Sequence, residues 1–240
     1  MNSIMDQILR LANRDKVVDI INNENLPGGT AQKEYNYLIV IDFESTCSVK
    51  TGEYCPTEII EFPAIIVDLK ENKTLEIFHH YVRPTEQPIL TDFCMNLTGI
   101  SQKIVDQAKS IELVLKLYDI WIKELQTKYG IEFREDAQVS VAHASWTDWD
   151  VRTCLYNECT RKKIPIPKYL LHRIDLKEIF KAWLETDHPL RLGIPKRMRW
   201  HGKLFDALTI LKLGFIGRQH SGIDDTKNTC RLLLKMRSVL

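Results

Sequence analysis

The chain has 240 residues, of which 44% are hydrophobic and 27% are charged, as is ordinary for a globular fold with a hydrophobic core. The formal net charge of +1 excludes a strongly basic chain, so any surface that binds nucleic acid must be local. No apolar run approaches the length of a membrane span, and we expect no membrane partner.

The N-terminal segment and the cysteines indicate an intracellular protein. Residues 1–18 include acidic side chains and lack the apolar stretch of a secretory signal. The six cysteines are scattered without a C-x-x-C pair, which argues against a zinc site and against a disulfide framework. We expect most of them to be small buried side chains in a reducing compartment, the cytoplasm, the nucleus or both.

Residues 1–35 are predicted to form a helical extension and a linker. Apolar residues at helical spacing, from Ile4 to Ile21, indicate one or two short amphipathic helices. The sequence LPGG at residues 26–29 then breaks this pattern. Residues 36–240 are predicted to form a single domain.

Three strands are predicted at the start of this domain. Residues 37–41 form a continuous apolar run that ends at Asp42, as is typical of a central strand buried on both faces. Residues 59–67 and 75–82 are rich in strand-forming residues and are separated by a polar turn at 70–73, which predicts a hairpin.

Helices and two further strands are predicted to alternate after the hairpin. A helix between Ser110 and Gly130 should bury one face, formed by Leu113, Val114, Leu117, Trp121 and Leu125. The elements that follow are a strand at 139–141, a helix at 150–159, a strand at 170–174, and three helices, which end near 184, span 204–211 and run from Asp225 to the C-terminus. This order predicts an α/β fold with a mixed central sheet flanked by helices.

Asp42-Phe43-Glu44 stands at the end of the first predicted strand. Residues two apart on an extended segment point to the same side, so the two carboxylates should converge at the edge of the sheet. Like charges this close repel, and a divalent cation such as Mg²⁺ or Mn²⁺ would relieve the repulsion. A strand that simply ends in a polar loop would give the same tripeptide.

Other candidate residues follow the fourth strand and precede the last helix. Asp148 and Asp150 could each cap a helix, and we interpret Asp148 in that way. His220 precedes Asp225 by five positions in a loop that contains glycine, and a histidine can take a proton from water. Taken singly, His220 could be a surface residue and Asp225 a charge at a helix N-terminus.

In combination, these residues predict a hydrolytic site. A D-x-E sequence on the first strand, an aspartate on a middle helix, and H-x-x-x-x-D near the C-terminus provide four carboxylates and a histidine. Such a set suits cleavage of a phosphodiester with two metal ions, which activate the attacking water and stabilise charge on the phosphate.

From about Tyr37 to Met236 the sequence resembles the DEDDh exonucleases, which have the ribonuclease H-like fold. The five residues that match the family pattern are Asp42, Glu44, Asp150, His220 and Asp225. The sequences EIIEFP at 58–63, FC and LTGI within 93–100, WD at 149–150 and GRQHSGIDD at 217–225 resemble the enhanced-RNAi and histone-mRNA 3′-exonuclease subfamily.

The resemblance implies a role for each of the five residues. Asp42 would contact both of two Mg²⁺ ions, for which Mn²⁺ would substitute. Glu44 and Asp225 would complete the site of the ion that holds the attacking water, and Asp150 would hold the second ion. His220 would be the general base.

The resemblance also implies contacts with the end of the substrate. Phe43, Leu97, Gly99 and Ile100 would form the pocket for the terminal base, and Thr46 would help to position the terminal nucleotide. Phe43, Leu97 and Ile100 could equally be plain core residues.

Two basic stretches differ in interpretation. The run at 160–163 follows a helix, where cations complement the helix dipole, and we interpret it as structural. The stretch at 191–203 includes Arg197, Arg199 and Trp200, which could contact phosphates and stack on a base. We interpret it as substrate-binding, with a solvated loop as the alternative.

The sequence therefore predicts a 3′-to-5′ exonuclease that releases nucleoside 5′-monophosphates from a free 3′-OH. RNA with an accessible 3′ end is the expected partner, and DNA is an open second substrate. The alternative is a nucleic-acid-binding scaffold that keeps the fold without catalysis. The oligomeric state is left open.

Overall fold

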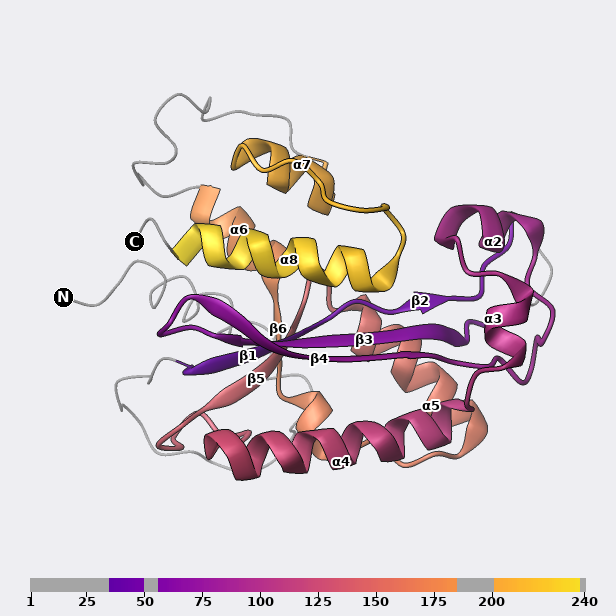
Figure 1. The fold of residues 1–240 in the computed structure, drawn as a ribbon, viewed down its shortest axis with the longest axis horizontal. Coiled ribbons are helices and arrows are strands. Elements are labelled where there is room, and N and C mark those ends of the chain that lie inside the picture. Colours follow the sequence, from indigo (N-terminus) through magenta and orange to yellow (C-terminus); the bar gives the residue numbers. More distant parts are fainter. Residues whose placement is uncertain (1–34, 50–55, 185–200, 238–240) are drawn as a thin grey trace.

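A mixed six-stranded sheet forms the centre of the protein, which a computed structural model describes over residues 35–49, 56–184 and 201–237 (Figure 1). The strands are β1 (Tyr37–Ile41), β2 (Glu44–Ser45), β3 (Ile59–Asp68), β4 (Lys73–Tyr81), β5 (Val141–Ser145) and β6 (Arg173–Asp175). Their order is β2-β3-β1-β5-β6, and β4 pairs with β3. β1 is antiparallel to β3 and parallel to β5, so it joins the hairpin to the parallel part of the sheet.

The β3–β4 hairpin is confirmed, and local hydrogen bonds explain its turn. The Asp68 Oδ1 atom accepts the backbone N–H of Lys70 at 2.9 Å and that of Glu71 at 2.8 Å. Asn72 has a φ of 52°, in the left-handed region that asparagine tolerates better than most residues.

β1 and β2 form one interrupted strand along the same edge of β3. The register that pairs Ile41 with Ala64 continues unchanged where β2 begins, and it places Asp42 opposite Pro63. Proline has no backbone N–H to donate to a neighbouring strand. The chain therefore leaves the ladder at Asp42 and Phe43, where the first candidate acid lies.

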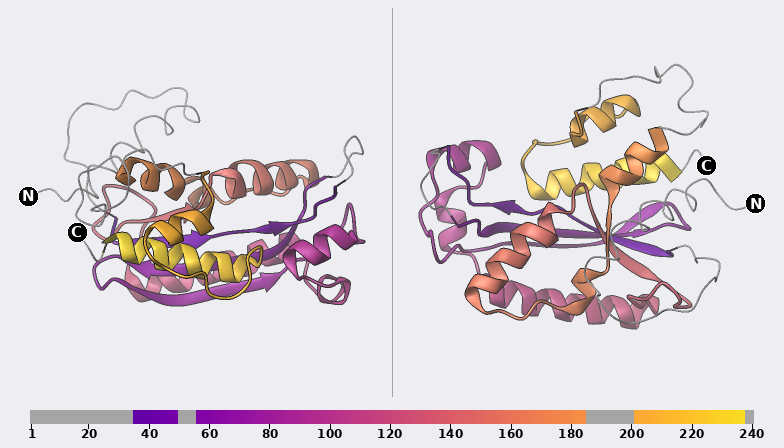
Figure 2. Two further views of the ribbon diagram at one scale, coloured as in Figure 1. Left: turned by 90° about the horizontal axis from the view of Figure 1, so that it is seen from above. Right: turned by 180° about the vertical axis from the view of Figure 1, so that it is seen from behind.

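Helices cover both faces of the sheet, with α6, α7 and α8 on one face and α4 and α5 on the other (Figures 1 and 2). The helices are α2 (Asp92–Thr98), α3 (Gln102–Asp106), α4 (Ile111–Tyr129), the π-helical η1 (Asp150–Leu155), α5 (Tyr156–Lys162), the 3₁₀ turn η2 (Lys168–Leu171), α6 (Leu176–Leu184), α7 (Leu204–Ile210) and α8 (Gly222–Arg237).

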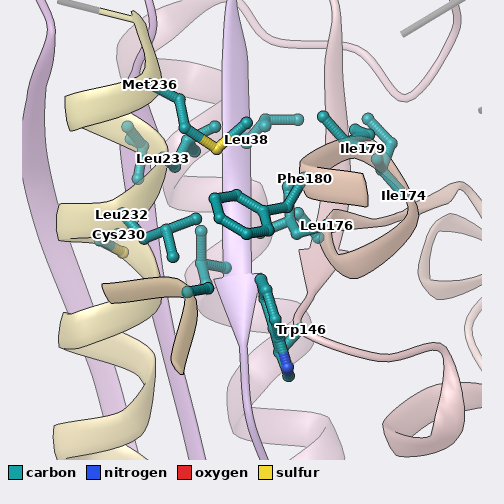
Figure 3. Close-up of a cluster of buried hydrophobic side chains, with 14 of the residues drawn as sticks. Leu38, Trp146, Ile174, Leu176, Ile179, Phe180, Cys230, Leu232, Leu233 and Met236 are labelled. Atoms are coloured by element: carbon teal, nitrogen blue, oxygen red, sulfur yellow. The ribbon is translucent and has the colours of Figure 1, made fainter. Parts of the chain in front are cut away.

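The two faces of β1 bury alternate side chains, as predicted for a central strand. Leu38 belongs to the cluster under α6, α7 and α8, where it lies near Phe180 and Met236 (Figure 3). Ile39 and Ile41 belong to the cluster under α4. Each fully buried aliphatic side chain contributes roughly 1.5–3 kcal/mol by its burial, so the strand that carries Asp42 is firmly held.

The helix predicted between Ser110 and Gly130 is confirmed as α4, but part of its predicted buried face is wrong. Gly130 ends the helix with a φ of 67°. Leu113 is exposed, whereas Tyr118 and Ile122 are buried. The buried stripe follows Ile111 at intervals of three and four, and Leu113 lies off that stripe.

Several other boundaries differ from the prediction. The strand predicted at 170–174 is wrong in its first half, because the carbonyl of Pro167 accepts the N–H of Leu170 at 3.0 Å and starts a 3₁₀ turn. The last helix begins at Gly222, three residues before Asp225. β2, α2 and α3 were not predicted. All but the last residue of the N-terminal extension predicted at 1–35 lies outside the described residues.

Two smaller expectations can be compared directly. Cys94, Cys154, Cys159 and Cys230 are buried, as predicted for cysteines that behave as small apolar residues. Within the described ranges, none of the helices has the length and apolar character that crossing a membrane requires.

Candidate active site

The interruption between β1 and β2 carries the first two candidate acids. Asp42 directly follows β1, and Glu44 begins β2. Each carboxylate interacts electrostatically with the other and with those of Asp150 and Asp225. The structure therefore brings together four acids that lie in distant parts of the sequence.

Asp150 reaches this place from the chain segment that follows β5. It begins the π-helical turn η1 and is only 4% exposed. Its Oδ1 atom accepts the backbone N–H of Phe43 at 2.8 Å, and this donor is available because Phe43 lies outside the strand ladder. π-Helical turns are rare and frequently occur at functional sites.

Asp148 is held separately, as a structural residue. Its carboxylate forms an ion pair with the guanidinium of Arg173, whose Nη2 atom lies at 3.2 Å. We interpreted Asp148 as a helix-capping residue, and its actual partner on β6 could not be read from local sequence.

α8 brings Asp225 to the cluster from the C-terminal part of the chain. The carboxylate of Asp225 accepts backbone hydrogen bonds from His220 and Ser221. A Cβ atom added at Gly222 would lie 2.7 Å from the backbone oxygen of Asp42. Glycine at this position therefore lets the first turn of α8 touch the end of β1.

Burial and mutual repulsion raise the pKa values of these carboxyl groups. Burial raises the pKa of Glu44 to about 8, and the neighbouring negative charges add to the effect. Burial raises the pKa of Asp150 and of Asp225 to about 7, although backbone N–H groups oppose the shift. Burial, followed by the charges around it, raises the pKa of Asp42 well above its usual range. Without a cation, the cluster therefore retains protons near neutral pH.

The donor chemistry of the cluster fits divalent cations. Four carboxylates offer hard oxygen ligands that suit Mg²⁺ or Mn²⁺, and a cation would relieve the repulsion that raises their pKa values. In the described part of the chain, no three or more His, Cys, Asp or Glu side chains already have the arrangement of a metal site. The acids would therefore reorient to share an ion.

His220 lies beside the cluster through its backbone. Its φ of 62° is in the left-handed region, where histidine is tolerated better than most residues. The backbone N–H points to Asp225, while the imidazole is exposed to solvent.

The loop that carries His220 is fixed at both ends. Gly217 has a φ of 87°, and a side chain there would collide with the carboxylate of Asp224. Asp224 in turn accepts the backbone N–H of Arg218 at 3.0 Å. The Arg218 guanidinium donates to carbonyl oxygens in the last turn of α2, including that of Leu97 at 3.3 Å. The loop that carries His220 is thus tied to α2.

The residues predicted to bind the terminal base differ in exposure. Leu97 is partly exposed and Gly99 is exposed at the C-terminal end of α2, next to Arg218. Ile100 is buried in the small cluster beneath α2 and α3. Phe43 is buried against Phe62, with ring centroids 4.4 Å apart. Ile100 and Phe43 therefore pack as core residues do, which is the alternative interpretation of these positions.

Thr46 is also buried, and its hydroxyl has partners within the chain. The Oγ1 atom donates to the carbonyl of Pro56 at 3.1 Å and accepts the backbone N–H of Glu58 at 3.0 Å. In this arrangement, Thr46 holds the end of β2 against the segment that enters β3.

The basic run at 160–163 is structural, and its partners are acids, two of which are buried. The Lys162 Nζ atom lies 2.6 Å from carboxylate oxygens of both Glu58 and Glu158. Arg161 pairs with Glu86 at 3.0 Å. The other basic stretch is not placed, because Arg197, Arg199 and Trp200 lie outside the described residues.

Glu61, which was not predicted as a site residue, lies beside the cluster. Its side chain is 1% exposed, and its charge acts on Asp42, Glu44 and Asp225. The available signal was a carboxylate inside the apolar run at 59–67. Such a residue is rarely buried on a central strand without specific partners.

Comparisons with known proteins give a family match over most of the chain. Residues 39–233 match the exonuclease family RNase_T. The chain is 36% identical over 212 residues to the 3′-5′ exonuclease Snipper of Drosophila melanogaster, covering 86% of this chain and 71% of Snipper. It is 38% identical over 221 residues to ERI1 exoribonuclease 2 of Xenopus laevis, covering 89% of this chain but 30% of that relative. The chain thus spans less than a third of the length of that exoribonuclease.

Among solved structures, the chain is similar to the nuclease domain of 3′hExo, a DEDDh family member bound to rAMP. The TM-score is 0.70 and the identity 28%, over 87% of this chain and 94% of that domain. This similarity confirms the predicted DEDDh exonuclease fold of the ribonuclease H-like class.

Proposed function

Because the chain belongs to the exonuclease family, we propose that it is a 3′-to-5′ exonuclease that hydrolyses RNA from a free 3′-OH end. The observation that carries this proposal is the meeting of Asp42, Glu44, Asp150 and Asp225 at one end of the sheet, with raised pKa values. A protein that only binds nucleic acid would gain nothing from converging acids, because they repel phosphate groups.

We assign the four carboxylates to two Mg²⁺ ions, with Mn²⁺ as a substitute. Asp42 interacts with all three of the other acids and is the best candidate to contact both ions. Glu44 and Asp225 would hold one ion and Asp150 the other. Bound ions of this kind supply Lewis acidity, which makes water a better nucleophile and neutralises charge on the phosphate.

We assign His220 as the general base. One nitrogen of its imidazole would accept the proton of the attacking water. The ring is exposed, so it must turn toward the acids when substrate binds, and catalytic hydrogen bonds often form only at that stage. The hydrogen bond between its backbone N–H and Asp225 keeps the base next to the acids.

The substrate end would lie between the acids and α2. Leu97 and Gly99 offer accessible surface for the terminal base, while Phe43, Ile100 and Thr46 are buried and would contribute through their packing. We propose that Arg197, Arg199 and Trp200 contact the strand further from its end.

The test uses a 5′-labelled single-stranded RNA, the DNA of the same sequence, and a circular form of each. We expect Mg²⁺-dependent shortening of the linear RNA with release of nucleoside 5′-monophosphates, and slower cleavage of a 3′-phosphorylated strand. Circles should remain intact. Cleavage of circles would identify an endonuclease, and tight binding without any Mg²⁺-dependent hydrolysis would favour the silent scaffold.

A further inference from the structure

Three nitrogen atoms contact the carboxylate of Glu61, and each of its two oxygens has at least one of them as a partner. Its Oε2 atom accepts the backbone N–H of Gly222 at 2.9 Å, and its Oε1 atom accepts that of Ile223 at 3.1 Å. Oε1 also lies 2.7 Å from Nε2 of His79. In the tautomer that carries its proton on Nε2, His79 donates to this oxygen.

These bonds hold the start of α8 against the middle of the sheet. The first backbone N–H groups of a helix have no partner within the helix, and Glu61 on β3 supplies one for two of them. Its negative charge also complements the positive end of the helix dipole. The same turn of α8 rests on the backbone of Asp42 and carries Asp225, so Glu61 fixes the geometry between these two acids.

His79 on β4 completes the arrangement from the other side of β3. Its side chain is 29% exposed, and its ring packs edge-on against Tyr81 at 5.1 Å between centroids. His79 therefore orients the carboxylate of Glu61 but lies at the border of the buried region, where it can be changed without emptying the core.

Resting on the function proposed above, we propose that Glu61 and His79 are positioning residues that set the place of Asp225 and the His220 loop. Glu61 does not need to bind an ion for this purpose, because both of its oxygens already accept N–H groups. It acts on catalysis through α8, and His79 acts through Glu61.

The experiment compares Glu61→Gln, His79→Gln and His79→Leu with the wild-type chain. An amide at position 61 presents one acceptor and one donor, so at least one N–H of α8 loses its partner. Glu61→Gln should lower kcat roughly 10- to 100-fold and raise the Mg²⁺ concentration for half-maximal activity, as changes to residues behind metal ligands do. KM for a short RNA should change little.

The two His79 variants distinguish the loss of an N–H donor to Glu61 from a change in side-chain volume. Glutamine can still donate an N–H to Glu61, so His79→Gln should keep most of the wild-type kcat. Leucine cannot donate, so His79→Leu should shift kcat and the Mg²⁺ requirement in the same direction as Glu61→Gln.

Glu58→Gln is the matched control. Glu58 is also fully buried next to β3 and accepts backbone N–H groups of Thr85, Glu86 and Gln87, together with Lys162, at a distance from the acids. This control should lower the melting temperature without raising the Mg²⁺ requirement. If Glu58→Gln and Glu61→Gln shift the Mg²⁺ requirement equally, the effect is general destabilisation and the inference is wrong.

The outcomes also separate this inference from the proposed function. An inactive wild-type chain would overturn both. An active wild-type chain with unchanged kcat and Mg²⁺ requirement in folded Glu61→Gln would overturn only the positioning role. If Glu61→Gln does not fold, the same decision rests on His79→Leu. Unchanged kcat and Mg²⁺ requirement in His79→Leu would overturn the positioning role. A shift in His79→Leu that is absent in His79→Gln would support it.

Discussion

Asp42 is the residue at which chain geometry and electrostatics meet. It leaves the strand ladder opposite Pro63, and burial together with the charges of Asp150, Asp225 and Glu44 raises its pKa. The residue that directly follows β1 is thus also the one on which the repulsion of the cluster is concentrated.

The first prediction concerns this side chain. Asp42→Asn should reduce RNA hydrolysis on the order of 10³-fold or more, because metal binding and charge stabilisation at the phosphate are lost together. At a pH high enough to ionise the wild-type cluster, the metal-free variant should melt at a higher temperature than the wild type, because one repelling charge is gone.

Asp148→Asn is the control for this change. Asp148 lies two residues from Asp150 but pairs with Arg173, so this variant should keep most of the activity. Turnover and melting curves are measured for both variants. Near-normal turnover in folded Asp42→Asn would rule out the assigned cluster.

The second prediction concerns His220. His220→Ala should lower the single-turnover rate by on the order of 10²–10⁴, the usual contribution of a positioned general base. His220→Asn should be similarly slow, because an amide cannot take the proton. Rates are measured against pH at saturating Mg²⁺, and the acidic limb of the wild-type profile should change in both variants. Wild-type rates in both would show that another group is the base.

At the residue scale, the sequence predicts acids better than it predicts pocket walls. The cluster of acids was predictable, because carboxylates in this order along the chain allow few other interpretations. Its members are Asp42, Glu44, Asp150 and Asp225. Apolar residues such as Phe43 and Ile100 carry no such signal, since a core and a binding pocket use the same side chains. Glu61 was missed because its partners are backbone N–H groups distant in sequence.

At the scale of elements, the close contact between α8 and β1 has a direct test. Gly222→Ala should lower the free energy of unfolding by roughly 1–3 kcal/mol and reduce activity, because a methyl group would press on the Asp42 backbone. Gly214→Ala is the control, since no atom lies within 4 Å of a Cβ at that position. Its free energy of unfolding should change by less than about 0.5 kcal/mol. Urea unfolding measures both, and equal effects would show that the contact is not tight.

Element boundaries were predictable where periodicity is long and were not where local chemistry decides. α4 and β1 follow from extended apolar patterns. The π-helical turn at Asp150 spans six residues and the 3₁₀ turn after Pro167 spans four, which is too short to leave a periodic trace in the sequence. α2 is only seven residues long, too short for a clear amphipathic signal.

At the scale of the whole molecule, the raised pKa values predict how stability depends on pH. The groups concerned have values near 4 in an unfolded chain and about 7 to 8 in the folded protein. The folded state therefore binds more protons, so this contribution is present below pH ~4 and is lost as the pH rises through ~7–8. With EDTA, the free energy of unfolding should fall by roughly 2–4 kcal/mol over this range, less than the sum for independent groups.

Mg²⁺ should reverse this loss, because a cation replaces the protons between the acids. The measurement is urea unfolding at pH 5 and pH 8, each with EDTA or with saturating Mg²⁺. Equal stability of the metal-free protein at both pH values would contradict the conclusion that the acids of the cluster retain protons in the folded state.

The contact between Gly222 and Asp42 also has a consequence for how the protein is made. Translation proceeds from the N-terminus, and domains generally fold as units while they emerge. A nascent chain that has reached α7 contains Asp42, Glu44 and Asp150, but neither His220 nor Asp225. While it is still held beside ribosomal and messenger RNA, such a chain lacks the base and the fourth acid of the proposed site. Docking of α8 is then the step that completes the proposed site.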